Sequence, residues 1–176
     1  TSFESIIAKD GQLFKVGSTL IEVLHTPGHT LESTTYLIKN STRKNHAIFS
    51  GDTLFLGDVG RPDLSQKTEN FTKEDLAGIL FDSLRNKIMP LEDDVIVYPA
   101  HGAGSSCGKN LSEETIGTLG DQKKTNYALR ADMTKNEFIR EVVYGLDAPP
   151  EYFQENVRLN KEGYADVSDI IKKAAK

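Results

Sequence analysis

Three short apolar stretches of the sequence are each followed closely by a residue that can bind a metal ion. The ligand candidates are His29, Asp52 and His101, and the apolar stretches before them cover residues 21–24, 47–49 and 95–98. Glycine or proline stands beside each candidate, so the backbone can turn sharply there and present the side chain. Because ligand sites in α/β sheets gather where strands end, three such coincidences in a chain with 4 histidines predict a metal site.

The three side chains suit a redox or a Lewis-acid metal. Two imidazoles and one carboxylate with open positions are typical of non-haem Fe(II) oxygenases, whereas histidine-rich tetrahedral sets are typical of zinc sites. Each candidate also has a structural interpretation: His29 as a turn residue, Asp52 as a cap of the next segment, and His101 as a buried, hydrogen-bonded histidine. We interpret His25 as a structural residue at a strand end and His46 as an exposed turn residue.

The elements that must position these residues are strands in the first half of the chain. Short runs rich in β-branched and apolar residues predict strands over residues 12–16, 19–25, 33–38, 46–50 and 95–98. Helices follow these strands or lie between them. Strands followed by helices indicate an α/β fold with helices packed on a sheet.

Helix signals dominate the second half of the chain. Capping-box patterns begin at Thr72 and Thr134, and each precedes apolar residues at helical spacing. Two adjacent prolines favour the first turn of a further helix. The predicted helices cover residues 72–88, 134–145, 149–157 and 166–176.

Composition and charge narrow the class of protein. The chain has 176 residues, of which 38% are hydrophobic and 27% charged, as in a folded globular domain. With 21 Lys and Arg against 26 Asp and Glu, its net charge of −5 disfavours nucleic acid as a partner. No apolar run approaches the roughly 20 residues that span a bilayer, and no signal-peptide pattern is seen, so we expect no membrane association and a cytoplasmic location. The single cysteine, Cys107, excludes an internal disulfide and fits a reducing compartment.

Around the ligand candidates the sequence resembles the metallo-β-lactamase superfamily. The matching motifs are residues 25–30 (HTPGHT), 50–55 (SGDTLF) and 98–102 (YPAHG). Two further segments resemble the persulfide dioxygenase branch, whose members are often fused to rhodanese domains. These segments are residues 55–64 (FLGDVGRPDL) and 101–109 (HGAGSSCGK). The resemblance extends from about Leu13 to Asn160.

The resemblance implies an αββα sandwich, in which helices cover two packed sheets. The His-x-His-x-Asp-His motif of the family's first half is absent from this sequence. We therefore expect residues 1–176 to be the C-terminal part of such a domain, with a helical tail from about residue 125. The expected partners are the N-terminal segment that would complete the domain and a fused rhodanese domain. The oligomeric state is left open, a homodimer included.

The resemblance also implies roles for the three ligand candidates. His29 and Asp52 match the family's second-motif histidine and bridging aspartate, and are expected to be catalytic. In persulfide dioxygenases these two residues bind a single Fe(II) ion together with a histidine of the first motif. His101 matches the third-motif histidine, which binds the second metal ion in dinuclear zinc hydrolases. In the iron branch that histidine more often lies outside the coordination sphere.

Two further residues of the resembling segments have expected roles. Arg61 lies where the family has an arginine near the substrate pocket, and it is expected to bind a carboxylate of a glutathione-like thiol. A structural pair with Asp58 or Asp63 is an equal alternative for this arginine. Cys107 is interpreted as an inert loop residue, because a reactive thiol needs a lowered pKa.

Three functions follow as hypotheses. The first is oxidation of a low-molecular-weight persulfide by O2 to thiol and sulfite, with one Fe(II) ion that supplies the redox chemistry. The second is hydrolysis of a thioester by two Zn(II) ions, as in glyoxalase II-like members, with Asp52 as the bridge and His101 as a ligand. The third is an inactive fragment whose uncovered sheet requires a partner segment.

Overall fold

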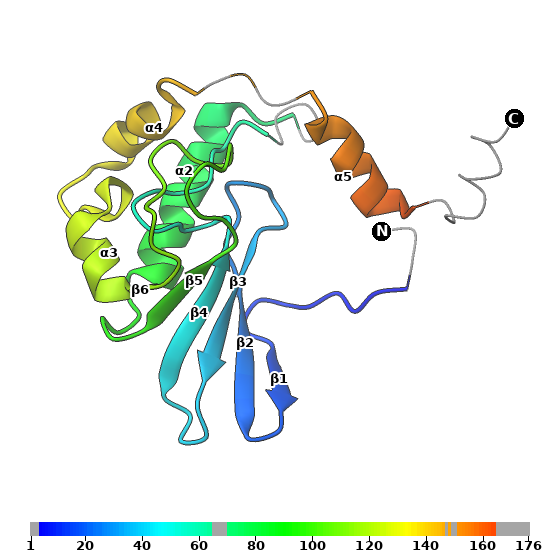
Figure 1. Cartoon of the computed structure of the whole chain (residues 1–176), viewed down its shortest axis with the longest axis vertical. Coiled ribbons are helices and arrows are strands. Elements are labelled where there is room, and N and C mark those ends of the chain that lie inside the picture. Colours follow the sequence, from blue (N-terminus) through cyan, green and yellow to red (C-terminus); the bar gives the residue numbers. More distant parts are fainter. Residues whose placement is uncertain (1–3, 65–69, 147, 149–150, 165–176) are drawn as a thin grey trace, which may run out of the picture. The chain divides into compact units, whose positions relative to one another are not determined.

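The structure of the chain, a computed structural model, describes residues 4–64, 70–146, 148 and 151–164 (Figure 1). The chain divides into two units, which are considered separately. Residues 8–147 form the larger unit, which contains the sheet and the predicted ligands. The described part of the other unit consists of residues 4–7, 148 and 151–164. Among all these described residues, no helix is both long enough and apolar enough to cross a membrane.

Six strands of the larger unit form one sheet in the order β1-β2-β3-β4-β5-β6. Their bounds are Leu13–Val16 (β1), Thr19–His25 (β2), Thr34–Lys39 (β3), Asn45–Gly51 (β4), Ile96–Pro99 (β5) and Gly117–Thr118 (β6). Neighbouring strands are antiparallel except β4 and β5, which are parallel. The five predicted strands are confirmed to within one residue at each end. The two-residue β6 is too short to give a periodic signal and was not predicted.

The helices of the larger unit are α2 (Lys73–Ser83), α3 (Leu119–Thr125) and α4 (Lys135–Val143). The capping boxes predicted at Thr72 and Thr134 are both present at the starts of α2 and α4. A π-helical turn, Leu84–Ile88, continues α2 to the predicted end of the helix. Helix α3, a seven-residue helix capped by Thr118, was not predicted.

The core lies between one face of the sheet and the helices. Leu37, Ile48 and Val97 are neighbours in the register of β3, β4 and β5, and each is at most 2% exposed. Leu80 of α2 belongs to the same buried cluster. Helix α4 packs beside α2 (Figure 1). At this contact the rings of Phe138 and Phe81 meet edge-on, with 5.4 Å between their centres. The predicted α/β fold with helices packed on a sheet is therefore confirmed.

The opposite face of the sheet carries exposed aromatic side chains. Tyr36 and Phe49 are paired across β3 and β4 and are 43% and 49% exposed. The ring of Phe49 also contacts Tyr98 of β5, with 5.4 Å between their centres. Because β-strands alternate their side chains, these residues point away from the core formed by Leu37 and Ile48.

The described part of the smaller unit contains helix α5, Phe153–Glu162. The prediction of a helix that ends at Val157 is wrong at that end, since α5 extends to Glu162. Arg158 forms ion pairs with Glu155 and Glu162 along the helix, and these pairs favour its continuation. The helix ends at Gly163, whose φ of 86° suits glycine. The two prolines at 149–150 and the helix predicted over 166–176 lie outside the described residues.

Candidate metal centre

The predicted ligands lie at one edge of the sheet, where three strands end. Strands β2 and β4 are both antiparallel to β3, and β5 is parallel to β4, so the carboxyl ends of β2, β4 and β5 point to the same edge. His29 follows β2, Asp52 follows β4 directly, and His101 lies two residues after β5. The amide of Ala100 donates to the carbonyl of Gly51 at 3.2 Å and joins two of these strand ends.

Asp52 stands between the two histidines. Its Oδ2 lies 3.1 Å from Nε2 of His29, and its Oδ1 lies 3.2 Å from Nε2 of His101. Donor atoms that each lie about 2.1 Å from one metal ion are about 3.0 to 3.4 Å from one another in tetrahedral or octahedral geometry. Both distances in the structure therefore suit donors that surround a cation.

The hydrogen bonding of His29 leaves one ring nitrogen for a cation. Its Nδ1 donates to the carbonyl oxygen of Arg61 at 2.8 Å, since a carbonyl can only accept. In the neutral ring, Nε2 then carries a lone pair that faces Oδ2 of Asp52. Two acceptors 3.1 Å apart repel each other unless a proton or a metal ion lies between them. A backbone carbonyl that fixes the tautomer in this way is typical of metal-binding histidines.

One oxygen of Asp52 has no hydrogen bond. Its Oδ1 is buried and accepts none from the part of the chain that the structure describes, although His101 lies at ion-pair distance. Burial alone would raise the pKa of Asp52, but the adjacent imidazoles of His29 and His101 outweigh burial and lower this pKa. The carboxyl group is therefore ionised at neutral pH and has an unused acceptor. These three residues fit a bound metal ion.

A second aspartate in the same loop, Asp58, holds together the loops around the centre. Asp58 is buried, with 1% of its surface exposed. Its carboxylate accepts hydrogen bonds from the backbone amides of Val59, Lys109 and Asn110 and from the hydroxyl of Tyr127. The loop after β4 is thereby fastened to the loop that follows His101. From the sequence, Asp58 was expected only as an alternative partner of Arg61. Its place within the apolar run 54–59 was the signal of a buried carboxylate.

Arg61 is buried among protein groups. Its guanidinium makes two hydrogen bonds of 2.7 Å to the carboxylate of Asp63 and donates to the carbonyl of Ser106 at 3.3 Å. The residue is 4% exposed, and its own carbonyl is the acceptor that orients His29. These contacts correspond to the structural arginine–aspartate pair that the sequence left as an alternative. The substrate-binding role of Arg61 remains a prediction.

Cys107 lies within reach of the centre. Its Sγ and donor atoms of Asp52 and His101 are all within 4.8 Å of one another, and the residue is 7% exposed. Burial raises the pKa of the Cys107 thiol, and the charge of Asp52 adds to this rise. The sequence predicts an inert loop residue at this position and gives no indication that it lies beside Asp52.

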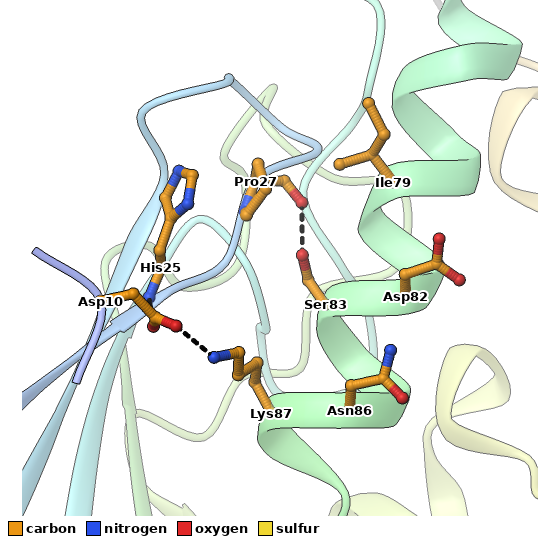
Figure 2. Close-up of a pocket in the computed structure, with 8 residues that line it drawn as sticks. All are labelled: Asp10, His25, Pro27, Ile79, Asp82, Ser83, Asn86 and Lys87. Carbon is orange, nitrogen blue, oxygen red and sulfur yellow. Dashed lines mark hydrogen bonds and ion pairs between the residues drawn. The ribbon is translucent and has the colours of Figure 1, made fainter.

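The turn that carries His29 is anchored to α2 beside an open cavity of about 270 Å³ (Figure 2). The hydroxyl of Ser83 donates to the carbonyl of Pro27 at 2.7 Å, and Asp10 accepts from the amide of His25 at 2.9 Å. The Nε2 of His25 donates to a carbonyl of the same turn at 2.8 Å, as its structural interpretation predicts. None of the predicted ligands lines this cavity, which is therefore distinct from the candidate centre.

Curated relatives align with a large part of this chain. The probable hydroxyacylglutathione hydrolase glo2 of Schizosaccharomyces pombe is 33% identical over 138 residues, which cover 67% of this chain and 49% of the relative. The hydroxyacylglutathione hydrolase GloC of Haemophilus influenzae is 32% identical over 101 residues, which cover 57% of this chain and 42% of the relative. The chain thus spans at most about half the length of these relatives. No family model matches it.

Solved structures align with still more of the chain. The metallo-β-lactamase from Staphylococcus aureus subsp. aureus COL has a TM-score of 0.81 and 34% identity, over 91% of this chain and 45% of that chain. ETHE1 from Myxococcus xanthus has a TM-score of 0.69 and 27% identity, over 88% of this chain and 59% of that chain. Both structures therefore share the arrangement of most elements described above.

Proposed function

Because this chain belongs to the metallo-β-lactamase superfamily and has its α/β fold, we propose that it forms the C-terminal part of a metal-dependent enzyme. We propose that the enzyme oxidises a low-molecular-weight persulfide with O2 and binds Fe(II) through His29 and Asp52. The observation that carries the metal centre is the buried Asp52, which lies between two imidazoles and has an oxygen without a hydrogen bond.

The choice of a persulfide substrate rests on the loops around this centre. The segments 55–64 and 101–109, which resemble the persulfide dioxygenase branch, are joined to each other by Asp58 and by the hydrogen bond from Arg61 to Cys107. ETHE1, a persulfide dioxygenase, aligns with 88% of the chain at 27% identity. A probable hydroxyacylglutathione hydrolase of Schizosaccharomyces pombe aligns with 90% of it at 26% identity, so the choice of a persulfide rests on the two loop segments and not on the extent of the alignment.

The net reaction is R–S–SH + O2 + H2O → R–SH + SO3²⁻ + 2 H⁺. Bound iron would supply the redox chemistry. His29 and Asp52 would hold it, and the Arg61 carbonyl keeps Nε2 of His29 directed at Asp52. The side chain of His101 is 41% exposed and its Nε2 is next to Asp52, so it can accept a proton that the reaction releases.

A zinc-dependent thioester hydrolase is the second candidate, and one feature of the site favours it. Asp52 directs one oxygen to His29 and the other to His101, as expected of a carboxylate that bridges two ions. The two curated relatives named above are hydroxyacylglutathione hydrolases. In the zinc hydrolase His101 would bind metal, whereas in the iron dioxygenase it would not.

The proposal includes a further polypeptide segment that completes both the sheet packing and the coordination sphere. Tyr36 and Phe49 are 43% and 49% exposed on the face opposite the core, and contiguous apolar faces are normally covered in folded domains. Within the described residues, only His29 and Asp52 are assigned to the iron ion, and an iron ion needs more donors than these two residues supply. Without the added segment, the chain alone would be an inactive fragment, the third hypothesis. A fused rhodanese domain would then receive or supply the sulfur carrier.

Metal content and oxygen uptake distinguish these candidates. If the protein is a dioxygenase, we expect about one iron per chain and consumption of O2 with glutathione persulfide. If the protein is a hydrolase, we expect about two zinc ions per chain and cleavage of S-lactoylglutathione without O2 uptake. If the iron-loaded protein, completed by the further segment, consumes no O2 with the persulfide, the dioxygenase proposal is wrong.

Two substitutions test the ligand assignment. In the protein completed by the further segment, Asp52→Ala should abolish metal binding, because it removes the anionic donor between the histidines. His101→Ala should leave iron bound in the dioxygenase and remove a metal ion from the zinc enzyme. His46→Ala, a change at an exposed strand histidine, is the matched control and should retain the full metal content. A fully metallated Asp52→Ala protein would contradict the assignment.

A further inference from the structure

Three threonine hydroxyls are buried near the strand ends that present His29 and Asp52. Thr26 follows β2, Thr35 lies in β3 and Thr53 follows β4, and each of these residues is 0% exposed. Valine has nearly the same shape as threonine and would fill such a place without the cost of burying a polar group. Buried hydroxyls next to predicted ligands therefore point to a task other than filling the core.

The hydroxyl of Thr26 joins the other two into what we call the threonine cluster. Its Oγ1 lies 2.8 Å from Oγ1 of Thr53 and 3.1 Å from Oγ1 of Thr35, at hydrogen-bond distance from both. The hydroxyl of Thr53 also donates to the carbonyl of Thr26 at 3.3 Å, and that of Thr35 donates to the carbonyl of Ser50 at 3.5 Å. The cluster thus connects three neighbouring strands of the sheet, β2, β3 and β4.

The threonine cluster holds both ends of the turn that presents Asp52. The amide of Thr53 donates to the carbonyl of Ser50 at 3.0 Å and closes a four-residue turn around Gly51 and Asp52. Gly51 has a φ of 55°, which suits glycine in such a turn. Because Ser50 and Thr53 are also bound to the other members of the cluster, the turn cannot tilt without breaking these hydrogen bonds.

The same cluster holds the loop that presents His29. The amide of Thr26 donates to the carbonyl of Ser33 at 2.9 Å, so these two residues close the loop that contains His29. Thr26 is therefore the point at which this loop is bound to the turn of Asp52. The separation that depends on this attachment is the 3.1 Å between Nε2 of His29 and Oδ2 of Asp52.

We propose that Thr26 and Thr53 are positioning residues, whose hydrogen bond keeps His29 and Asp52 at the separation that one cation requires. This inference rests on the proposed metal centre, whichever metal and reaction that centre serves. Each threonine acts through the loop that it anchors and not as a ligand. Ligands that are no longer held within about 0.5 Å of their bound geometry bind a metal ion more weakly.

Binding of Co²⁺ to the protein completed by the further segment tests this role, because the visible bands of Co²⁺ report the geometry of its ligands. Thr53→Val should weaken Co²⁺ binding about 10- to 100-fold and alter these bands. Thr53→Ser keeps the hydroxyl and should show the affinity and the spectrum of the wild type. Adding Thr26→Val to Thr53→Val should cost little more affinity, since both changes remove the same hydrogen bond.

Two further variants separate positioning from stability. Val142→Ala shortens a core side chain of α4 that is 2% exposed, so it should lower stability but leave the affinity for Co²⁺ and the spectrum unchanged. Thr35→Val replaces Thr53→Val if that variant does not fold. It removes a hydrogen bond of Thr26 from a strand position that suits valine, and should weaken Co²⁺ binding in the same direction.

Four results would contradict the inference. Wild-type affinity and spectrum in the valine variants at the cluster would show that the hydroxyls position nothing. An equal loss in Thr53→Ser and Thr53→Val would show that the shape of the side chain matters and its hydroxyl does not. A similar loss in Val142→Ala would mean that Co²⁺ binding follows overall stability. If the wild-type protein binds no Co²⁺, the proposed metal centre itself is wrong, and this inference fails with it.

Discussion

The loop after β4 contains two aspartates in contrasting surroundings. Asp58 is 1% exposed, and each of its carboxylate oxygens accepts two hydrogen bonds. The side chain of Asp52 is 22% exposed, and its Oδ1 accepts no hydrogen bond from the described residues. Native proteins rarely leave a buried polar atom without a partner except where function uses it. The contrast therefore separates a carboxylate that stabilises the fold from one that is available to a ligand.

The largest effect on stability is expected for Asp58→Asn. The amide is nearly isosteric, but its NH2 group must face two of the N–H or O–H donors that now meet a carboxylate oxygen. Buried donors left without acceptors destabilise by about 1 to 3 kcal/mol each, so the free energy of unfolding should fall by about 3 kcal/mol or more. Urea denaturation would measure this change.

Asp82→Asn is the matched control for this prediction. Its carboxylate is 53% exposed and pairs with Lys135 at the surface. Surface pairs contribute roughly 0 to 1 kcal/mol, so this variant should unfold almost as the wild type does. Equal destabilisation by the two substitutions would contradict the structural role of Asp58.

Gly60→Ala should damage the surroundings of Asp52, because Gly60 packs directly against Asp52 and His29. A Cβ at this position would be 1.9 Å from the carbonyl oxygen of Asp52 and 3.0 Å from Nδ1 of His29. The backbone must shift to admit it, which should lower the unfolding free energy by about 2 to 3 kcal/mol and reduce metal binding. Calorimetry and metal analysis would report both changes.

Gly102→Ala controls for the loss of a glycine next to the centre. Gly102 follows His101 directly, yet a Cβ there would meet no atom of the described residues within 4 Å. This variant should keep wild-type stability and metal content. If Gly60→Ala behaves in the same way, the close packing around Asp52 has been overestimated.

The sequence could predict where His29, Asp52 and His101 lie, because each follows an apolar strand whose pattern is visible. The strand pairing then determines that β2, β4 and β5 end at the same edge. The capping boxes at Thr72 and Thr134 were equally visible, since they depend on residues three positions apart.

The positions of Asp58 and Cys107 could not be predicted in this way. Both lie in loops without periodicity, and their surroundings depend on hydrogen bonds between segments about 50 residues apart, such as that from Asn110 to Asp58. Helix α3 was missed for a related reason: its sequence, LGDQKKT, has no apolar stripe, and Leu119 and Gly120 are buried by tertiary packing. The partner of Arg61 could not be predicted either, because only the structure shows that its guanidinium donates two hydrogen bonds to Asp63.

The smallest effect on the metal-free fold is expected for Asp52→Asn, the counterpart of Asp58→Asn. An amide oxygen at this position can still accept a hydrogen bond if His29 is protonated, and no donor to Oδ1 is lost. At pH 7 the metal-free variant should lose less than about 1 kcal/mol of unfolding free energy. Because the folded pKa of Asp52 lies below its ordinary value of 3.8, the carboxylate stabilises the fold above that pH, and its contribution disappears as the pH falls through the folded pKa. The stability difference between the two proteins should therefore shrink below pH 3.8, as urea denaturation at several pH values would show. A loss near that of Asp58→Asn at neutral pH would mean that both aspartates serve the fold, and the distinction between them would fail.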